Sequence, residues 1–83
     1  AGLLYSLGRV YRRWGEVGLA IIYLRDAAAV LDAAEERRGR EFAGVARELA
    51  GAYREIGAAV PAKRWLGLAE EAANAGTADD PLI

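Results

Sequence analysis

The sequence contains no cysteine and no histidine among its 83 residues. Without cysteine there is no disulfide framework, no thiolate zinc site and no cysteine nucleophile. Without histidine the commonest general base and the commonest metal ligand are both missing. Ser6 therefore has no imidazole to activate it. We expect no catalytic residue, no metal site and no cofactor-binding residue, and hence a protein that is not an enzyme.

Long hydrophobic runs and an excess of one charge are also missing. The longest apolar run, residues 17–24, is far shorter than the ~20 residues that cross a bilayer. The first residues carry no secretion-signal pattern. Lysine and arginine number 11 and the acidic residues 12, mixed along the chain, which argues against nucleic-acid binding. We expect no membrane and no nucleic-acid partner, and a soluble protein that is cytoplasmic if it is natural.

Methionine is missing as well, and the sequence begins at Ala1. An engineered sequence and a fragment excised from a natural protein both fit these observations. The joint absence of methionine and histidine favours an engineered sequence, which need not have a natural partner.

Apolar residues recur at helical spacing in four segments, namely 2–14, 16–38, 40–56 and 61–75. Three glycines at the ends of the first three segments are natural helix stops, namely Gly15, Gly39 and Gly57. Gly76 is the expected cap of the fourth. We predict one all-α domain of four antiparallel helices over residues 1–76, followed by a tail over residues 77–83.

Each segment has an apolar arc that we predict to form the core. In the first segment these residues are Leu3, Leu4, Leu7, Val10, Tyr11 and Trp14. In the second they are Val17, Ala20, Leu24, Ala27, Leu31 and Ala34. In the third they are Phe42, Val45, Ala46, Leu49, Tyr53 and Ile56. In the fourth they are Ala62, Trp65, Leu66, Ala69 and Ala73.

The second segment is apolar on its far side too, at Leu19, Ile22 and Ala29. A helix that is apolar nearly all round is covered on both flanks. It either lies centrally in the domain or meets another copy of the protein. We therefore predict weak self-association through these three residues.

The second half of the chain repeats the first with a shift of 42 residues. The shift aligns Leu7 with Leu49, Tyr11 with Tyr53, Gly15 with Gly57 and Leu24 with Leu66. A fixed period of this size is typical of arrays of helical hairpins. We expect two such hairpins, over residues 2–38 and 40–75.

The repeated positions resemble the tetratricopeptide-repeat pattern. In the first hairpin they are Leu7, Gly8, Tyr11, Gly15, Ala20, Leu24 and Ala27. In the second they are Leu49, Ala50, Tyr53, Gly57, Ala62, Leu66 and Ala69. The sequence departs from the pattern at the tryptophan-like position, which holds Leu4 and Ala46, and its period exceeds the common 34 residues. A plain up-down four-helix bundle is the rival fold.

The resemblance implies that the first helices of the two hairpins line one side and bind a peptide or partner protein. Basic and aromatic residues gather on that side, namely Tyr5, Arg9, Arg12, Arg13, Arg47 and Arg54. They make a candidate surface for an acidic peptide, although Glu48 and Glu55 dilute its positive charge. An ordinary solvated face is the alternative interpretation.

Gly44 and Gly51 also point away from the predicted core, seven residues apart. They either have no role or form a shallow groove that another backbone approaches closely. Altogether the sequence predicts a non-enzymatic helical-repeat scaffold or protein-interaction module. The alternative is a structural bundle that assembles through the second helix.

Overall fold

The computed structural model describes residues 2–34 and 39–78 and contains four helices. These are α1 (Gly2–Arg13), α2 (Val17–Ala33), α3 (Arg40–Glu55) and α4 (Ala59–Ala78). No strand occurs in the described residues. The predicted all-α class is confirmed.

The turn after α1 and the turn after α3 have the same backbone hydrogen bonds, 42 residues apart. Gly15 N–H donates to Arg12 C=O at 3.1 Å and Glu16 N–H to Tyr11 C=O at 2.9 Å. The bonds at Gly57 and Ala58 repeat these at 3.0 and 2.9 Å. This pair of bonds is the Schellman motif, which requires a positive φ that glycine adopts without strain. Gly15 and Gly57 have φ values of 83° and 78°, so the predicted helix ends are confirmed there.

The predicted boundaries of α2 and α4 differ most from the structure, and α4 begins at Ala59, two residues before its predicted start. α2 ends at Ala33, and the predicted continuation over residues 35–38 lies outside the described residues. α4 continues through Gly76 to Ala78, so the predicted cap at Gly76 is wrong. A glycine inside a helix costs only about 1 kcal/mol relative to alanine, which does not by itself end a helix. The remaining tail, residues 79–83, also lies outside the described part.

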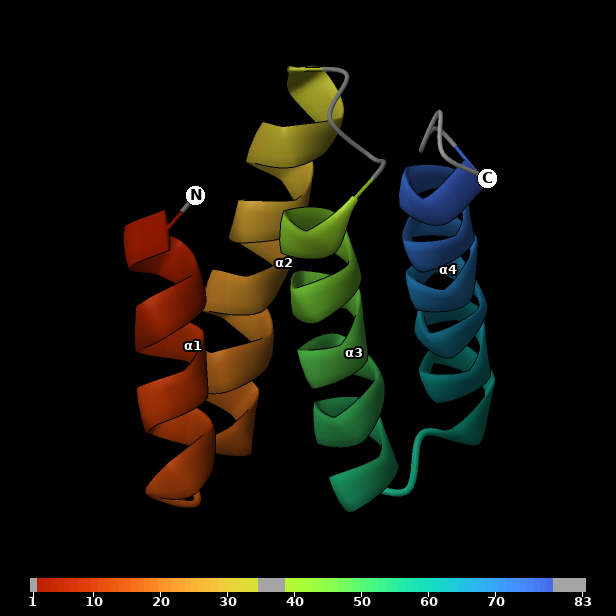
Figure 1. Cartoon of the computed structure of the whole chain (residues 1–83). Helices are drawn as coiled ribbons and strands as arrows, with labels where there is room; N and C mark the ends of the chain where they lie inside the picture. Colours follow the sequence, from red (N-terminus) through yellow and green to blue (C-terminus); the bar gives the residue numbers. More distant parts are fainter. Residues whose placement is uncertain (1, 35–38, 79–83) are drawn as a thin grey trace.

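The helices form an open row in chain order, and consecutive helices run in opposite directions (Figure 1). α1 packs on α2, α2 on α3 and α3 on α4, and α1 also touches α3. Among the described residues, no Cα atom of α4 lies within 8 Å of one in α1 or α2. The row therefore does not close into a bundle in which the first and last helices meet.

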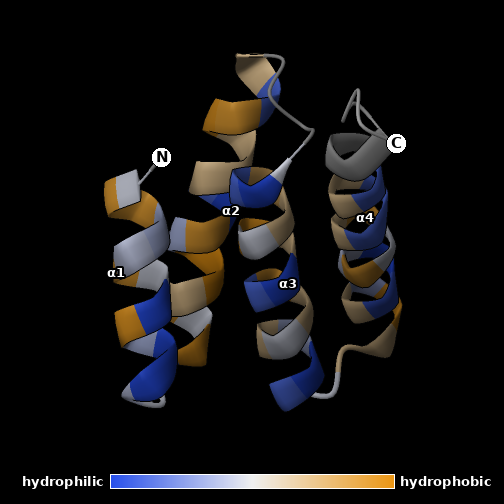
Figure 2. Cartoon of the chain, viewed as in Figure 1, coloured by the Kyte–Doolittle hydropathy of each residue, from blue (hydrophilic) through white to orange (hydrophobic). Residues whose placement is uncertain are grey.

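The centre of the core lies between α2 and α3. Its largest completely buried side chains are those of Leu24, Leu49 and Val45. Gly8 is the only buried residue of α1, and a Cβ atom at this position would lie 2.5 Å from Leu24 Cγ. Gly8 thus allows α1 and α2 to approach closely. Figure 2 shows hydrophobic residues along much of α2 and hydrophilic residues on the visible sides of α3 and of the C-terminal half of α1.

Several residues predicted to be buried are exposed instead. They include Leu3 and Val10 of α1 and Trp14 in the turn after it, with exposed fractions of 76%, 40% and 72%. α1 stands at the end of the row and has neighbours only towards α2 and α3, so its outer side meets no helix. Ala34, Ile56 and Leu66 were also predicted to be buried and are exposed. Ala34 and Ile56 lie just past the ends of α2 and α3, and Leu66 lies on the open side of α4.

Candidate functional site

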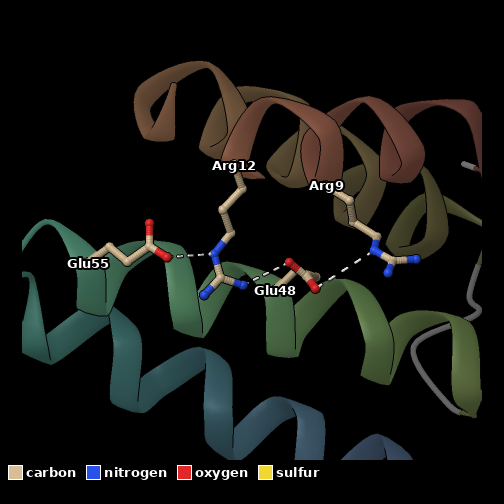
Figure 3. A network of polar contacts seen from close by, with 4 residues as sticks. All are labelled: Arg9, Arg12, Glu48 and Glu55. Atoms are coloured by element: carbon tan, nitrogen blue, oxygen red, sulfur yellow. Dashed lines mark hydrogen bonds and ion pairs between the residues drawn. The ribbon is translucent and has the colours of Figure 1, made fainter. Parts of the chain in front are cut away.

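Arg12 connects α1 to α3 through two glutamates (Figure 3). Its Nη1 donates to Glu48 Oε2 at 2.8 Å, and its Nε donates to Glu55 Oε1 at 3.1 Å. Arg9 Nε lies 3.9 Å from the other oxygen of Glu48. The side chains of Arg12 and Glu48 are about three-quarters buried, with exposed fractions of 27% and 24%. This cluster is the main polar contact between α1 and α3 among the described residues.

Gly44 and Gly51 make room for two α1 side chains that are also seven residues apart. A Cβ atom on Gly51 would lie 2.8 Å from Arg12 Cζ, and one on Gly44 would lie 3.1 Å from the hydroxyl of Tyr5. Because an α-helix brings residues seven apart to nearly the same side, the two pairs lie in register. The glycines therefore have a packing role. Side chains of α1 approach them, which differs from both alternatives that the sequence left open, namely no role or the approach of another backbone.

Tyr5 has a second partner in this contact. The guanidinium carbon of Arg9 lies 5.6 Å from the centre of the Tyr5 ring, within range of a cation–π interaction. Tyr5 is half-buried, so it is not the freely exposed aromatic that a binding face was predicted to offer. Tyr5 and Arg9 together extend the α1–α3 contact beyond Arg12.

The charge on Arg12 is held firmly. Partial burial lowers the pKa of Arg12, but hydrogen bonds and electrostatic attraction from Glu48 and Glu55 outweigh the burial and raise the pKa above its ordinary value. Since the folded-state pKa is raised, Arg12 remains protonated at lower pH, and its stabilising contribution is lost as pH rises through that value. Below that value the contribution also requires the negative charges of Glu48 and Glu55. Arg12 therefore stays charged wherever the protein is handled.

The predicted basic face is divided into two parts. Arg9, Arg12 and Arg13 line a hollow of about 220 Å³ between α1 and α3 together with Glu48 and Glu55. Arg47 and Arg54 instead line a larger hollow of about 510 Å³ between α3 and α4. Arg13, Arg47 and Arg54 are exposed. The structure thus brings Arg12 to acidic partners and leaves these three arginines accessible.

Sequence reasoning missed the groove between α3 and α4. Lys63 and Leu66 of α4 line it with Arg47 and Arg54 of α3. The 42-residue shift could have indicated it, because it aligns Arg47 and Arg54 with Tyr5 and Arg12, whose side chains contact α3. A smaller hollow of about 310 Å³ lies between α2, α3 and α4, beside Ala29 and Phe42.

The predicted self-association residues lie on the surface of α2. Leu19 and Ile22 are 41% and 56% exposed, and Ala29 is exposed as well. Val30 of the same helix is 48% exposed. α2 therefore has contacts towards α1 and α3 and an apolar side that no described residue covers.

No group of three or more acidic residues in the described part of the chain is arranged to hold a metal ion. No described helix is long and apolar enough to span a membrane. No protein-family model matches the chain, and no curated protein or solved structure matches it significantly.

Replacing Arg12 with methionine, which keeps most of the stem and removes the charge, is expected to destabilise the fold by about 1 kcal/mol. A double-mutant cycle of Arg12→Met with Glu48→Gln, measured by urea unfolding, is expected to give a coupling energy of about 0.5–1 kcal/mol. Arg13→Met is the matched control, since Arg13 is exposed on the same helix. Equal losses for the two arginines would contradict the proposed role of the cluster.

Gly67→Ala and Gly51→Ala are expected to change stability differently. Gly67 lies inside α4 with nothing within 4 Å of an added Cβ atom, so alanine there is expected to stabilise by about 0.5–1 kcal/mol. At Gly51 the new methyl group displaces the guanidinium of Arg12. The gain should therefore disappear or reverse. Thermal unfolding followed by circular dichroism measures both, and an equal gain at both sites would contradict the Gly51–Arg12 contact.

Proposed function

We propose that the chain is a non-enzymatic helical-repeat module, similar to tetratricopeptide repeats, that binds an acidic segment of a partner protein. The two matching turns and the 42-residue sequence repeat support the division into two helical hairpins. The open row supports the comparison with a repeat array, because each unit of such an array contacts only its neighbours.

One observation carries the binding proposal. After Arg12 is engaged by Glu48 and Glu55, Arg13, Arg47 and Arg54 are still exposed on α1 and α3. α1 also touches α3, so an extended peptide along these two helices meets positive charge from both. Arginine forks bind carboxylates through paired hydrogen bonds. An acidic peptide is therefore the ligand that this side favours.

The test is a titration of an Asp/Glu-rich peptide with a free carboxylate against the wild type and an Arg9→Glu, Arg13→Glu double variant. The wild type should bind weakly, and binding should fall as salt shortens the screening length from ~30 Å at 0.01 M to ~8 Å at 0.15 M. The double variant, which retains Arg12, should bind at least tenfold more weakly. Equal binding by both proteins, or none by the wild type at low salt, would overturn the proposal.

A second function, structural self-assembly, is supported by the uncovered apolar side of α2. Leu19 and Ile22 are large and exposed on it. We propose weak self-association there, measured as mass by light scattering over a range of concentrations. Ile22→Glu should abolish it, while Val60→Glu, at an exposed valine of α4, should not. A strict monomer at high concentration would contradict self-assembly.

A further inference from the structure

The groove between α3 and α4 corresponds, through the 42-residue shift, to the surface on which α3 packs. Ala50 and Arg54 of α3 are the counterparts of Gly8 and Arg12 of α1. On α4, Ala62 and Leu66 are the counterparts of Ala20 and Leu24 of α2. In the first half of the chain, α3 packs on both helices that carry these residues. In the second half, no helix among the described residues follows α4.

Exposure differs between the two halves in the way that this correspondence requires. Leu24 is completely buried, whereas its counterpart Leu66 is 39% exposed. Ala20 is completely buried, whereas Ala62 is half-buried. The hollow of about 510 Å³ lies directly against Ala62 and Leu66. The groove thus has the residues that hold a helix in the first half, without the helix.

The side chains of α3 indicate which residues a helix in the groove would need. Val45, Leu49 and Ala52 of α3 are completely buried and share one side of the helix at spacings of four and three residues. Glu48 and Glu55, on the adjacent side, bind Arg12 at 2.8 and 3.1 Å. The pattern is therefore an apolar stripe at i, i+4 and i+7 with acidic residues at i+3 and i+10.

The charge of the groove favours the same acidic pattern. Its described lining includes Arg47, Arg54 and Lys63 and no acidic residue. Arg54 takes the place that Arg12 has in the first half and is exposed. Carboxylates at i+3 and i+10 of an incoming helix would meet Arg54 as Glu48 and Glu55 meet Arg12. An acidic edge thus complements both the position and the sign of the charge.

A second copy of this chain fits the groove less well. The helix of that copy with the matching apolar residues is α1, whose Leu3, Leu7 and Val10 align with the apolar stripe of α3. At the two acidic positions α1 has Ser6 and Arg13. Arg13 of the second copy would lie close to Arg54, and the two positive charges would repel each other. A partner helix with an acidic edge therefore fits the groove better than α1 of a second copy does.

We propose that the groove between α3 and α4 binds an amphipathic helix of a partner protein, with apolar residues at i, i+4 and i+7 and acidic residues at i+3 and i+10. The inference goes beyond the proposed acidic-peptide function, because it assigns a different surface, the groove between α3 and α4, and names the structural class of its partner. Leu66 and Ala62 contact the apolar stripe, and Arg54 pairs with the acidic edge.

The probe is a labelled 16-residue peptide that keeps the α3 residues at positions 45, 48, 49, 52 and 55 and has alanine, glutamine or lysine elsewhere. Fluorescence anisotropy measures its binding to the full chain. Leu66→Glu and Arg54→Glu should each weaken binding at least tenfold. Val60→Glu, the matched control on the exposed surface of α4, should change it less than twofold. Circular dichroism and melting temperature verify that each variant is folded.

The acidic edge is tested with a second peptide in which both glutamates are glutamine. It should bind at least fivefold more weakly, and its affinity should depend less on salt. Unchanged binding of the first peptide to the Leu66→Glu protein would overturn the groove proposal. If the first peptide binds the Arg9→Glu, Arg13→Glu protein more weakly but binds the Leu66→Glu and Arg54→Glu proteins as it binds the wild type, the groove proposal fails. The proposed acidic-peptide function then stands. If both surfaces fail to bind their probes, both proposals fail.

Sedimentation of the chain alone tests the other occupant. The wild type and the Leu66→Glu variant should show the same state of assembly. Oligomers that grow with protein concentration, disappear in Leu66→Glu and persist in Val60→Glu would assign the groove to a second copy and overturn the proposed partner.

Discussion

Replacing Leu24 with alanine is expected to destabilise the protein by about 2–5 kcal/mol, because it opens a cavity at the closest approach of α1 and α2. Leu24 is completely buried and lies against Gly8, so α1 is not free to move in and fill the space without losing its contact with α3. A loss of 3 kcal/mol corresponds to a fall in melting temperature of about 12–24 °C for a domain of this size. Urea unfolding measures the loss, and a value below ~0.5 kcal/mol would contradict the core position.

Gly8→Ala provides a partner measurement for Leu24→Ala. In the wild type the new methyl group would lie 2.5 and 2.7 Å from two atoms of Leu24, and such overpacking typically costs about 1–3 kcal/mol. With alanine at position 24 the space is available, so the same change should be neutral or stabilising by up to about 1 kcal/mol through helix propensity. A double-mutant cycle detects this change of sign. Equal effects in both backgrounds would contradict the direct contact.

Replacing Phe42 with alanine is expected to cost about 3–5 kcal/mol. Phe42 is 3% exposed, and its ring centre lies 6.5 Å from that of Trp65 on α4. α2 and α4 have no close backbone contact among the described residues, and Phe42 of α3 lies at the hollow between these two helices. Its removal should therefore loosen α4 more than α1 or α2.

Hydrogen exchange distinguishes this local effect from general destabilisation. In the Phe42→Ala protein the amides of α4 should lose protection before those of α2, because regions with fewer neighbours open at lower free energy. Ile22→Ala, at an exposed position of α2, is the control and should change neither. Equal loss of protection in all four helices would mean that the row unfolds as one unit, contrary to this prediction.

The ends of the helices were largely predictable because they depend on local chemistry. Gly15 and Gly57 end α1 and α3 through their own positive φ and the hydrogen bonds of the following residue. Gly76 shows where the same rule fails. A glycine ends a helix only where the residues after it adopt a non-helical backbone. The residues after Gly76 are helical as far as Ala78.

The side that α1 buries was not predictable from its own periodicity. Leu3, Val10 and Trp14 form a good apolar arc, yet the helix turns Gly8 to α2 and Arg12 to α3. The choice depends on the glutamates of α3, whose positions relative to α1 follow from packing rather than from the local pattern. The same reason explains why the sequence did not predict that Glu48 and Glu55 bind Arg12 of the basic face directly.

The open row also has a consequence for the speed of folding. Contacts form mainly between helices that follow each other in the chain, so the loops that folding must close are short. Helical domains dominated by such local contacts fold in microseconds to milliseconds. Either hairpin, α1–α2 or α3–α4, is able to form first, and the other hairpin then packs on it as a unit. We therefore expect fast kinetics in which Phe42→Ala mainly alters the addition of α4.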